Sequence, residues 1–112
     1  MLVSELSKLI DAVTVTQEVP DRDVTCGYTC DLLSWVMAKG KEGCAWITVQ
    51  THMNVVAVAS LHDMACIICP EGIEAEPPSV AKATQEGIAV LCSKKTAYEI
   101  CGLMHAAGIP TV

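Results

Sequence analysis

Phenylalanine is absent from this 112-residue sequence, and Phe, Trp and Tyr together make up only 4% of it. Positive charge is also scarce: 7 Lys and Arg residues stand against 13 Asp and Glu, which gives a formal net charge of −6. Non-specific binding to nucleic acid needs many lysine or arginine contacts to phosphate groups. We therefore expect no nucleic-acid partner, and a core built from Val, Ile, Leu, Ala, Met and Cys.

Long hydrophobic runs are missing as well. Runs such as residues 55–59 (VVAVA) fall far short of the ~20 apolar residues that a transmembrane helix needs. The first residues, MLVSE, lack the basic start of a secretion signal and reach a charged residue at once. We therefore expect no membrane partner and a cytoplasmic location.

The length suits one compact domain covering residues 1–112, and a chain of this size buries roughly two thirds of its unfolded surface. Apolar residues make up 52% of the sequence, which is more than a small acidic monomer easily hides. This excess predicts a homodimer. The candidate paired surfaces are the helical segment 55–61 and the region around Trp35.

The amino-terminal third mixes helical and extended patterns. Apolar residues recur at helical spacing in 4–10, whereas 12–16 alternates Val with Thr, as in a strand with one wet face. A second extended stretch is predicted at 24–28. Asp31 stands where it could cap a helix over 32–39.

The remaining two thirds alternates apolar strands and helices three times. Nearly continuous apolar strands are typical of a parallel sheet that is covered on both faces, and parallel neighbours require right-handed crossovers. We predict a three-layer α/β/α fold: a mostly parallel sheet of about five strands with helices on both faces, the first one or two strands being candidates for antiparallel pairing. Strands are expected at 44–49, 65–69 and 88–92, and helices from Thr51 or Asn54 to 62, at 77–87, and from Thr96 to 107.

Three segments together resemble the small DRTGG domain, namely 21–28 (DRDVTCGY), 31–34 (DLLS) and 46–54 (WITVQTHMN). Further likeness at 86–88, 97–100 and 108–109 extends the resemblance over nearly the whole chain. The chain departs from the family at Cys26-Gly27, where the family's motif has paired glycines.

The resemblance implies a regulatory or accessory module, similar to the amino-terminal domain of HPr kinase and to domains attached to phosphotransacetylases and nucleotide-sensing pyrophosphatases. It also implies a dimerising unit. On this ground we expect a non-catalytic homodimer that binds a nucleotide, another anionic metabolite or a partner enzyme, and that needs no cofactor.

Small free-standing proteins of this kind often carry the label serine kinase, which the residues do not favour. Gly40-Lys41-Glu42-Gly43 lacks the Gly-x-x-x-x-Gly-Lys-Ser/Thr spacing that wraps backbone amides around a phosphate. Thr25 and Ser34 could act as nucleophiles only with a nearby base, and no histidine lies close to either along the chain. We therefore expect no enzymatic activity.

The ligand site is predicted at the carboxyl ends of the parallel strands, where helix amino termini also point their free N–H groups. Two loops there carry hydroxyl, amide, imidazole and ammonium groups, a set that suits an anion if the two strands lie near each other. Thr51, Asn54 and Thr96 are also ordinary helix caps, and Lys94-Lys95 also fits a solvated loop. The candidates are Gln50, Thr51, His52 and Asn54 in the first loop, Ser93, Lys94, Lys95 and Thr96 in the second, and Thr25 and Gly27 in the DRTGG-like segment.

Seven cysteines are an unusual number for such a chain. Cys66 and Cys69 lie three apart in a predicted strand, so their thiols point to opposite faces and cannot bind one ion. Cys69 and Cys92 both end strands and Cys30 precedes a helix, which gives an alternative hypothesis: a redox, metal or iron–sulfur accessory protein that uses these three residues. Free cysteine also fills cores as a small apolar residue, so we predict no metal and no disulfide framework.

The histidines and aspartates have simpler predicted roles. His52 and His62 flank one predicted helix about 15 Å apart and cannot share a metal, so we expect surface or capping positions for both. His105 is expected at a packed edge with its hydrogen bonds satisfied. Asp21 and Asp23 are expected to form turns, caps and ion pairs.

Overall fold

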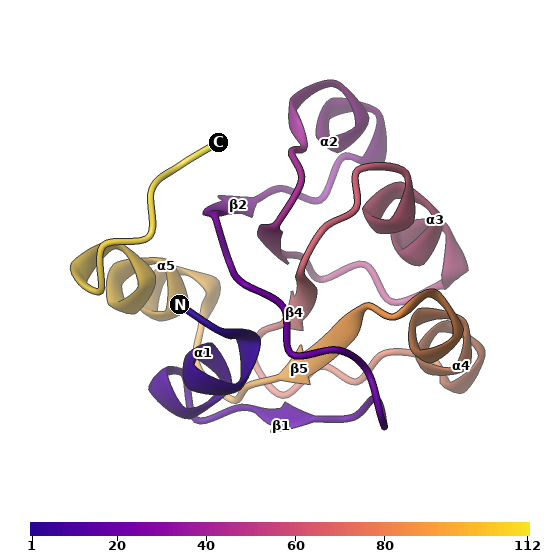
Figure 1. Cartoon of the computed structure of the whole chain (residues 1–112), viewed down its shortest axis with the longest axis horizontal. Coiled ribbons are helices and arrows are strands. Elements are labelled where there is room, and N and C mark those ends of the chain that lie inside the picture. Colours follow the sequence, from indigo (N-terminus) through magenta and orange to yellow (C-terminus); the bar gives the residue numbers. More distant parts are fainter.

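A five-stranded sheet lies at the centre of the molecule (Figure 1). The computed structural model describes residues 1–112. Along the chain the strands are β1 (Val13–Thr14), β2 (Cys26–Thr29), β3 (Cys44–Ile47), β4 (Cys66–Cys69) and β5 (Ala89–Cys92). Their order across the sheet is β1-β5-β4-β3-β2, and only β1 runs antiparallel to its neighbour. The predicted mostly parallel sheet is confirmed.

Five helices cover the two faces of this sheet (Figure 1). From β2 to β5, each parallel strand follows the previous one toward the same edge of the sheet, so the crossover helices all lie on one face. These helices are α2 (Leu33–Lys39), α3 (Met53–Leu61) and α4 (Pro77–Glu86). The other face is covered by α1 (Val3–Leu9) and α5 (Ala97–Ala106). The predicted helices on both faces are confirmed. None of the five is long and apolar enough to span a bilayer.

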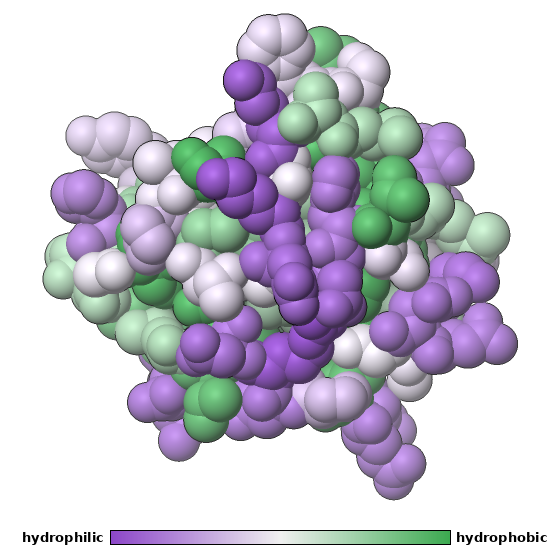
Figure 2. Space-filling view, turned by 45° about the horizontal axis from the view of Figure 1, so that its top comes forward, coloured by the Kyte–Doolittle hydropathy of each residue, from purple (hydrophilic) through white to green (hydrophobic).

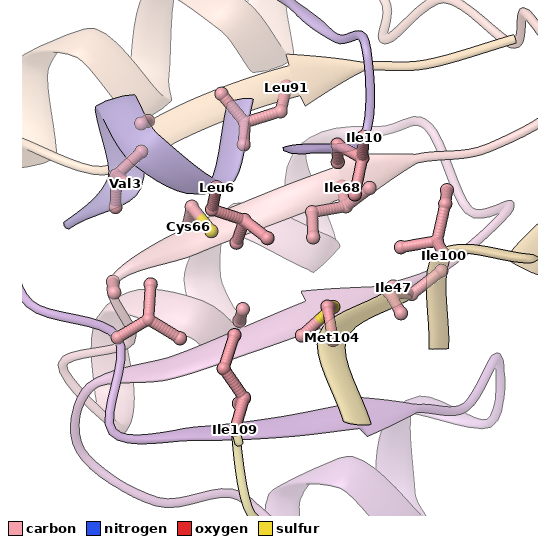
Figure 3. Packing of buried hydrophobic residues seen from close by; sticks show 14 residues of the cluster. Val3, Leu6, Ile10, Ile47, Cys66, Ile68, Leu91, Ile100, Met104 and Ile109 are labelled. Carbon is pink, nitrogen blue, oxygen red and sulfur yellow. The ribbon is translucent and has the colours of Figure 1, made fainter. Parts of the chain in front are cut away.

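Each face has its own apolar core. Figure 3 shows the α1 and α5 side, where Leu6 and Ile100 pack toward Ile68 of β4 and all three are fully buried. On the opposite face the largest buried side chain is Trp46, whose indole N–H donates to the carbonyl of Cys30 at 2.8 Å. A satisfied N–H makes a buried tryptophan stabilising rather than costly, so this contact fastens β3 to the end of β2.

The connection from β1 to β2 crosses the whole width of the sheet, because these strands lie at opposite edges (Figure 1). Arg22 anchors it to the turn between α3 and β4. Its guanidinium donates to the carbonyls of Asp63 at 3.0 Å and Met64 at 2.8 Å, and lies 3.0 Å from the Asp63 carboxylate. Arg22 thus serves the fold and lies away from the carboxyl ends of the strands.

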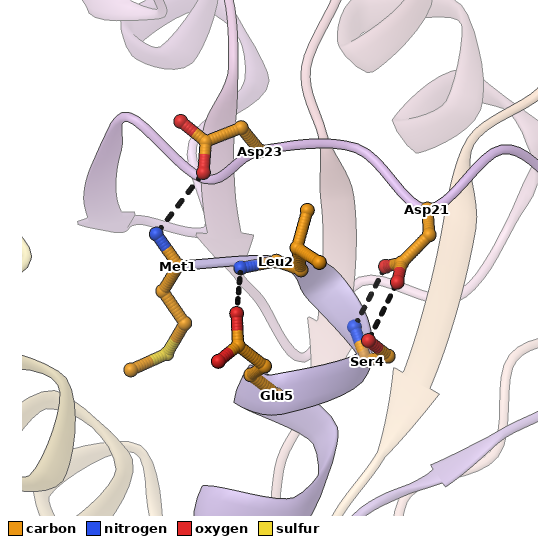
Figure 4. A network of polar contacts seen from close by, with 6 residues as sticks. All are labelled: Met1, Leu2, Ser4, Glu5, Asp21 and Asp23. Atoms are coloured by element: carbon orange, nitrogen blue, oxygen red, sulfur yellow. Dashed lines mark hydrogen bonds and ion pairs between the residues drawn. The ribbon is translucent and has the colours of Figure 1, made fainter.

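The two aspartates beside Arg22 hold the amino-terminal segment (Figure 4). The carboxylate of Asp21 accepts hydrogen bonds from the backbone N–H of Ser4 at 2.9 Å and from its hydroxyl at 2.6 Å. These bonds lower the pKa of Asp21. The amino group of Met1 lies 3.0 Å from Asp23. Asp21 thus accepts from the first turn of α1, and Asp23 forms an ion pair, which confirms one predicted role for each.

The strand predicted over residues 12–16 is shorter than expected. Only Val13 and Thr14 form it, and both are exposed. Thr16 is buried, and its hydroxyl accepts a hydrogen bond from the backbone N–H of Val90 at 3.2 Å. The predicted division into an apolar Val face and a wet Thr face is therefore wrong.

Three predicted helix caps are also wrong. Either the side chain makes hydrogen bonds to distant residues, or the helix begins at another residue. Asp31 does not cap α2; it accepts from the hydroxyl of Thr48 at 2.8 Å and from the backbone N–H of Val49 at 2.9 Å. The N-cap of α3 is His52, without a side-chain bond, so neither Thr51 nor Asn54 caps that helix.

Candidate ligand-binding groove

The two predicted ligand loops lie at the same edge of the sheet, but β4 separates the strands that precede them. The loop after β3 is hydrogen-bonded to neighbouring segments of the chain. The side-chain amide of Gln50 donates to the carbonyl of Asp31 at 3.0 Å, and the hydroxyl of Thr51 donates to Glu76 at 3.1 Å. The hydroxyl of Ser79 donates to the carbonyl of Thr51 at 2.8 Å.

Beside these contacts the first loop has only a very small cavity. The cavity lined by Gln50, Thr51 and His52 measures about 10 Å³, which at most holds one water molecule. His52 and Asn54 are exposed at the start of α3 and lie outside any larger cavity.

In the second loop most side chains also have structural partners. The hydroxyl of Ser93 is buried and donates to the carbonyl of Ile10 at 2.6 Å, and the ammonium of Lys95 lies 3.5 Å from Asp11. Thr96 and Glu99 form the predicted capping box of α5. Lys94 is exposed and has no ion pair. It is the loop's available cation.

Thr25 and Gly27 lie apart from both loops. Thr25 precedes β2 at the amino edge of the sheet, where its hydroxyl donates to the carbonyl of Glu42 at 2.7 Å. Gly27 lies inside β2, and its N–H donates to the carbonyl of Pro110 at 2.8 Å. A Cβ at Gly27 would lie 2.8 Å from the terminal methyl group of Met104, and Gly27 lines a cavity of about 360 Å³ between β2 and α5.

The structure does not bring together the three cysteines of the alternative metal hypothesis. Cys69 and Cys92 are partners in the pairing of β4 with β5, whereas Cys30 follows β2, two strands beyond β4. No group of three His, Cys, Asp or Glu side chains is placed to hold a metal ion. All seven cysteines are free thiols. The proposed cluster of Cys30, Cys69 and Cys92 is therefore wrong.

The substantial cavity at this edge is a groove between β1 and α4, with a volume of about 890 Å³. The crossover helices explain its position. The crossover helices cover one face of the sheet, and α4 is the last of them. Strand β1 lies outside β5 at the edge of the sheet, and no helix covers β1 on that face. The groove has apolar walls of Val13, Val15, Pro77, Val80 and Ala81 and polar groups from Gln17, Glu74, Thr84, Cys92, Ser93 and Lys94.

A solved structure has a similar overall fold. It is the crystal structure of the CBS and DRTGG domains of the regulatory region of Clostridium perfringens pyrophosphatase, in complex with its activator diadenosine tetraphosphate. The likeness has a TM-score of 0.72 at 12% identity, and covers 91% of this chain and 45% of that chain. This chain thus spans less than half of the other's length, and at such low identity the likeness shows the fold alone. No family model and no curated protein matches the sequence.

Two groups of opposite charge lie on the groove. Lys94 follows β5, and Glu74 precedes α4.

Cys92 forms part of the floor of the groove and is half-buried. Hydrogen bonds from the thiol of Cys69 and from the backbone N–H of Ala75 lower the pKa of Cys92 from its ordinary value of 9.0 to about 7, although partial burial and Glu74 oppose this shift.

Sequence reasoning found Ser93 and Lys94 but missed most of the groove. Val13, Gln17 and Glu74 come from segments far apart in the chain, and only the pairing of β1 with β5 brings them together. That pairing has no local signal, because a two-residue strand carries no usable periodicity.

The histidines differ partly from expectation. His62 follows α3, and its Nε2 atom is buried without a hydrogen-bond partner. His105 is exposed and lines a second cavity of about 360 Å³ between β2 and α5, so its predicted place at a packed edge is wrong.

Proposed function

We propose that this chain is a non-catalytic regulatory module that binds a small anionic ligand, a nucleotide or a phosphorylated metabolite, in the groove between β1 and α4. The observation that carries the proposal is the groove itself. Its volume of about 890 Å³ lies in the range of small-molecule sites, and apolar walls with a few polar groups are typical of such sites.

The distribution of charge in the groove favours a ligand with two different ends. Lys94 has no partner within the chain and suits a phosphate or carboxylate. The carboxylate of Glu74 would repel an anion beside it, but it accepts hydrogen bonds from hydroxyl or amino groups. A nucleotide combines an apolar flat base, hydroxyl groups and phosphate. The nucleotide activator bound to the structurally similar regulatory region supports the same ligand class.

A regulatory role is favoured over phosphoryl transfer. A phosphate loop connects a strand to the helix that follows it, so that the helix start faces the phosphate. Gly40-Lys41-Glu42-Gly43 instead connects the end of α2 to the start of β3. The N–H of Gly43 donates to the carbonyl of Asp63 at 3.0 Å, so it is already used in the fold.

We further propose that the module is a homodimer and acts on a partner enzyme. The predicted surface at 55–61 is mostly buried, whereas Trp35 is 54% exposed, so the region around Trp35 is the better candidate. Leu32, Val49 and Met53 are also exposed near the ends of β2 and β3. On the face in Figure 2, hydrophobic residues form separate groups divided by a hydrophilic band.

Thermal unfolding with ATP and with diadenosine tetraphosphate tests the groove. We expect either nucleotide to raise the melting temperature, and Lys94→Ala to weaken binding about tenfold, because a charge-assisted hydrogen bond contributes about 1.5 kcal/mol or more. Ala81→Trp should block the groove and remove the shift. Sedimentation of the same samples measures the dimer.

Lys41→Ala is the matched control, because it removes an exposed lysine from the loop between α2 and β3 with the same change in charge. It should bind like the parent chain. Equal nucleotide shifts in Lys94→Ala, Ala81→Trp and the parent chain would remove the groove as the site.

A further inference from the structure

The floor of the groove carries a pair of thiols that differ in accessibility. Cys69 ends β4 and Cys92 ends β5, and the two residues are direct partners across these parallel strands. Both belong to the face covered by α3 and α4. Cys69 is buried, with 1% of its surface exposed, whereas Cys92 is half-buried and lines the groove. A small reactant in the groove can therefore reach Cys92 but not Cys69.

Several groups around Cys92 affect its charge. Glu74, which precedes α4, raises its pKa, and the N–H of Ala75 lowers it. Lys94 and Lys95 follow it in the chain and lie with Asp11 and Glu99 on a smaller hollow that also reaches Cys92. The Cys69 thiol makes the largest contribution, and the same contact raises the pKa of Cys69. The pair thus ionises first at the accessible sulfur.

The other cysteines do not share this combination. Burial raises the pKa of Cys66 to about 12, and it also raises the pKa of Cys44 and of half-buried Cys101. Because the thiolate is the reactive form, these residues are poorer nucleophiles at neutral pH. Cys92 combines a lowered pKa, access from the groove and a second thiol beside it.

We propose that Cys92 is a site of reversible oxidation by hydroperoxides and that Cys69 is its resolving thiol. Neighbouring strands lie about 4.8 Å apart, a separation that falls within the Cα–Cα range of disulfides. This inference does not depend on the ligand proposed above.

The chemistry is a two-step reaction. With hydrogen peroxide, the thiolate sulfur of Cys92 attacks one oxygen, the O–O bond breaks, and the leaving hydroxide takes up a proton to form water; an organic hydroperoxide would instead release an alcohol. Cys92 becomes a sulfenic acid. The sulfur of Cys69 then attacks the sulfur of Cys92, the S–S bond forms, and the S–O bond breaks. The hydroxyl leaves with the Cys69 proton as a second water. Two thiols are oxidised to a disulfide while one hydroperoxide is reduced.

The experiment treats the reduced full chain with hydrogen peroxide and maps the products by peptide mass spectrometry. We expect a Cys69–Cys92 disulfide as the first product, which reductant reverses. Cys69→Ser should stop at the sulfenic acid of Cys92, which dimedone traps. Cys92→Ser should lose the fast reaction, whereas Cys101→Ser, at a half-buried cysteine outside the groove, should react like the parent chain.

Mapping the parent chain alone can overturn the proposal, so it does not depend on the folding of any variant. Oxidation at Cys30 or Cys101 before Cys92 would contradict the assignment of the reactive site. A disulfide between two copies through Cys92, with Cys69 still reduced, would contradict the role of Cys69.

Discussion

At the scale of single residues, Arg22 shows how a sequence motif can serve the fold. Its guanidinium donates to two carbonyls in the turn between α3 and β4. Asp63, the residue it contacts, has a positive φ of 54°, which costs energy for any residue other than glycine. Arg22 therefore stabilises a turn that the backbone alone would disfavour.

Arg22→Ala should lower the free energy of unfolding by about 1.5–3 kcal/mol, because two hydrogen bonds to a charged donor are lost and the carbonyls lose a partner. Urea denaturation measures this change. Arg22→Lys should recover only part of it, because an ammonium cannot reproduce the two-pronged geometry.

The variant Asp63→Asn removes the ion pair with Arg22 but keeps the hydrogen bonds from Arg22 to the two carbonyls, so it measures the contribution of the ion pair alone. Asp63 is 65% exposed, and exposed ion pairs contribute less than about 1 kcal/mol. A loss as large as that of Arg22→Ala would show that the ion pair, rather than the carbonyl bonds, is the main contribution.

At the scale of elements, helix ends were predictable only where the cap is local. Thr96 with Glu99, and Gly87 in its left-handed conformation after α4, were readable because every partner lies within one turn. Asp31 and Thr51 have the same capping chemistry, but distant partners take their side chains. A sequence pattern does not report such long-range competition.

Two glycines give a matched test of backbone effects within these elements. Gly102 lies exposed inside α5 with no atom near the position of a Cβ, so Gly102→Ala should stabilise the fold by about 0.5–1 kcal/mol. Gly43 has a φ of +74°, and a Cβ there would lie 2.5 Å from the hydroxyl oxygen of Thr25. Gly43→Ala should therefore be destabilising.

Thermal unfolding of both variants measures these effects. Melting temperatures that move in the same direction would contradict the assignment, because the two substitutions add the same methyl group and differ only in conformation and space.

At the scale of the whole molecule, the parallel order of the sheet could be predicted because apolar strands alternated with helices along the chain. The groove could not, because it depends on where β1 pairs. The rule that ligands bind at the carboxyl ends of strands pointed to the edge of the sheet at which the groove lies. The rule did not predict which of the four loops after the parallel strands borders an open groove, because that depends on how far α3 and α4 extend over the face of the sheet.

The many buried thiols predict a loss of stability in alkali. Burial raises the pKa of Cys66 from 9.0 to about 12. Below pH 9 both states keep this proton, so stability is intact. As pH rises from 9 toward 12, the unfolded thiol ionises while the folded one does not. The free energy of unfolding should fall by up to about 1.4 kcal/mol per pH unit for this group.

Denaturation in the presence of reductant, at several pH values between 8 and 11, measures the slope. Cys66→Ala should reduce the slope by this single-group amount. Ile68→Val, another buried change on the same face of β4, should lower stability equally at every pH. Parallel slopes for the parent chain and Cys66→Ala would refute the linkage.

The edges of the sheet have a consequence for assembly. At one edge β1 has only two residues, and at the other the N–H of Gly27 is already bonded to Pro110. Few free backbone groups remain to template another strand, so copies should not polymerise into fibres through continuous sheets. Unlimited growth through continuous sheets is thereby disfavoured, and we expect contacts between copies to be made mainly by side chains.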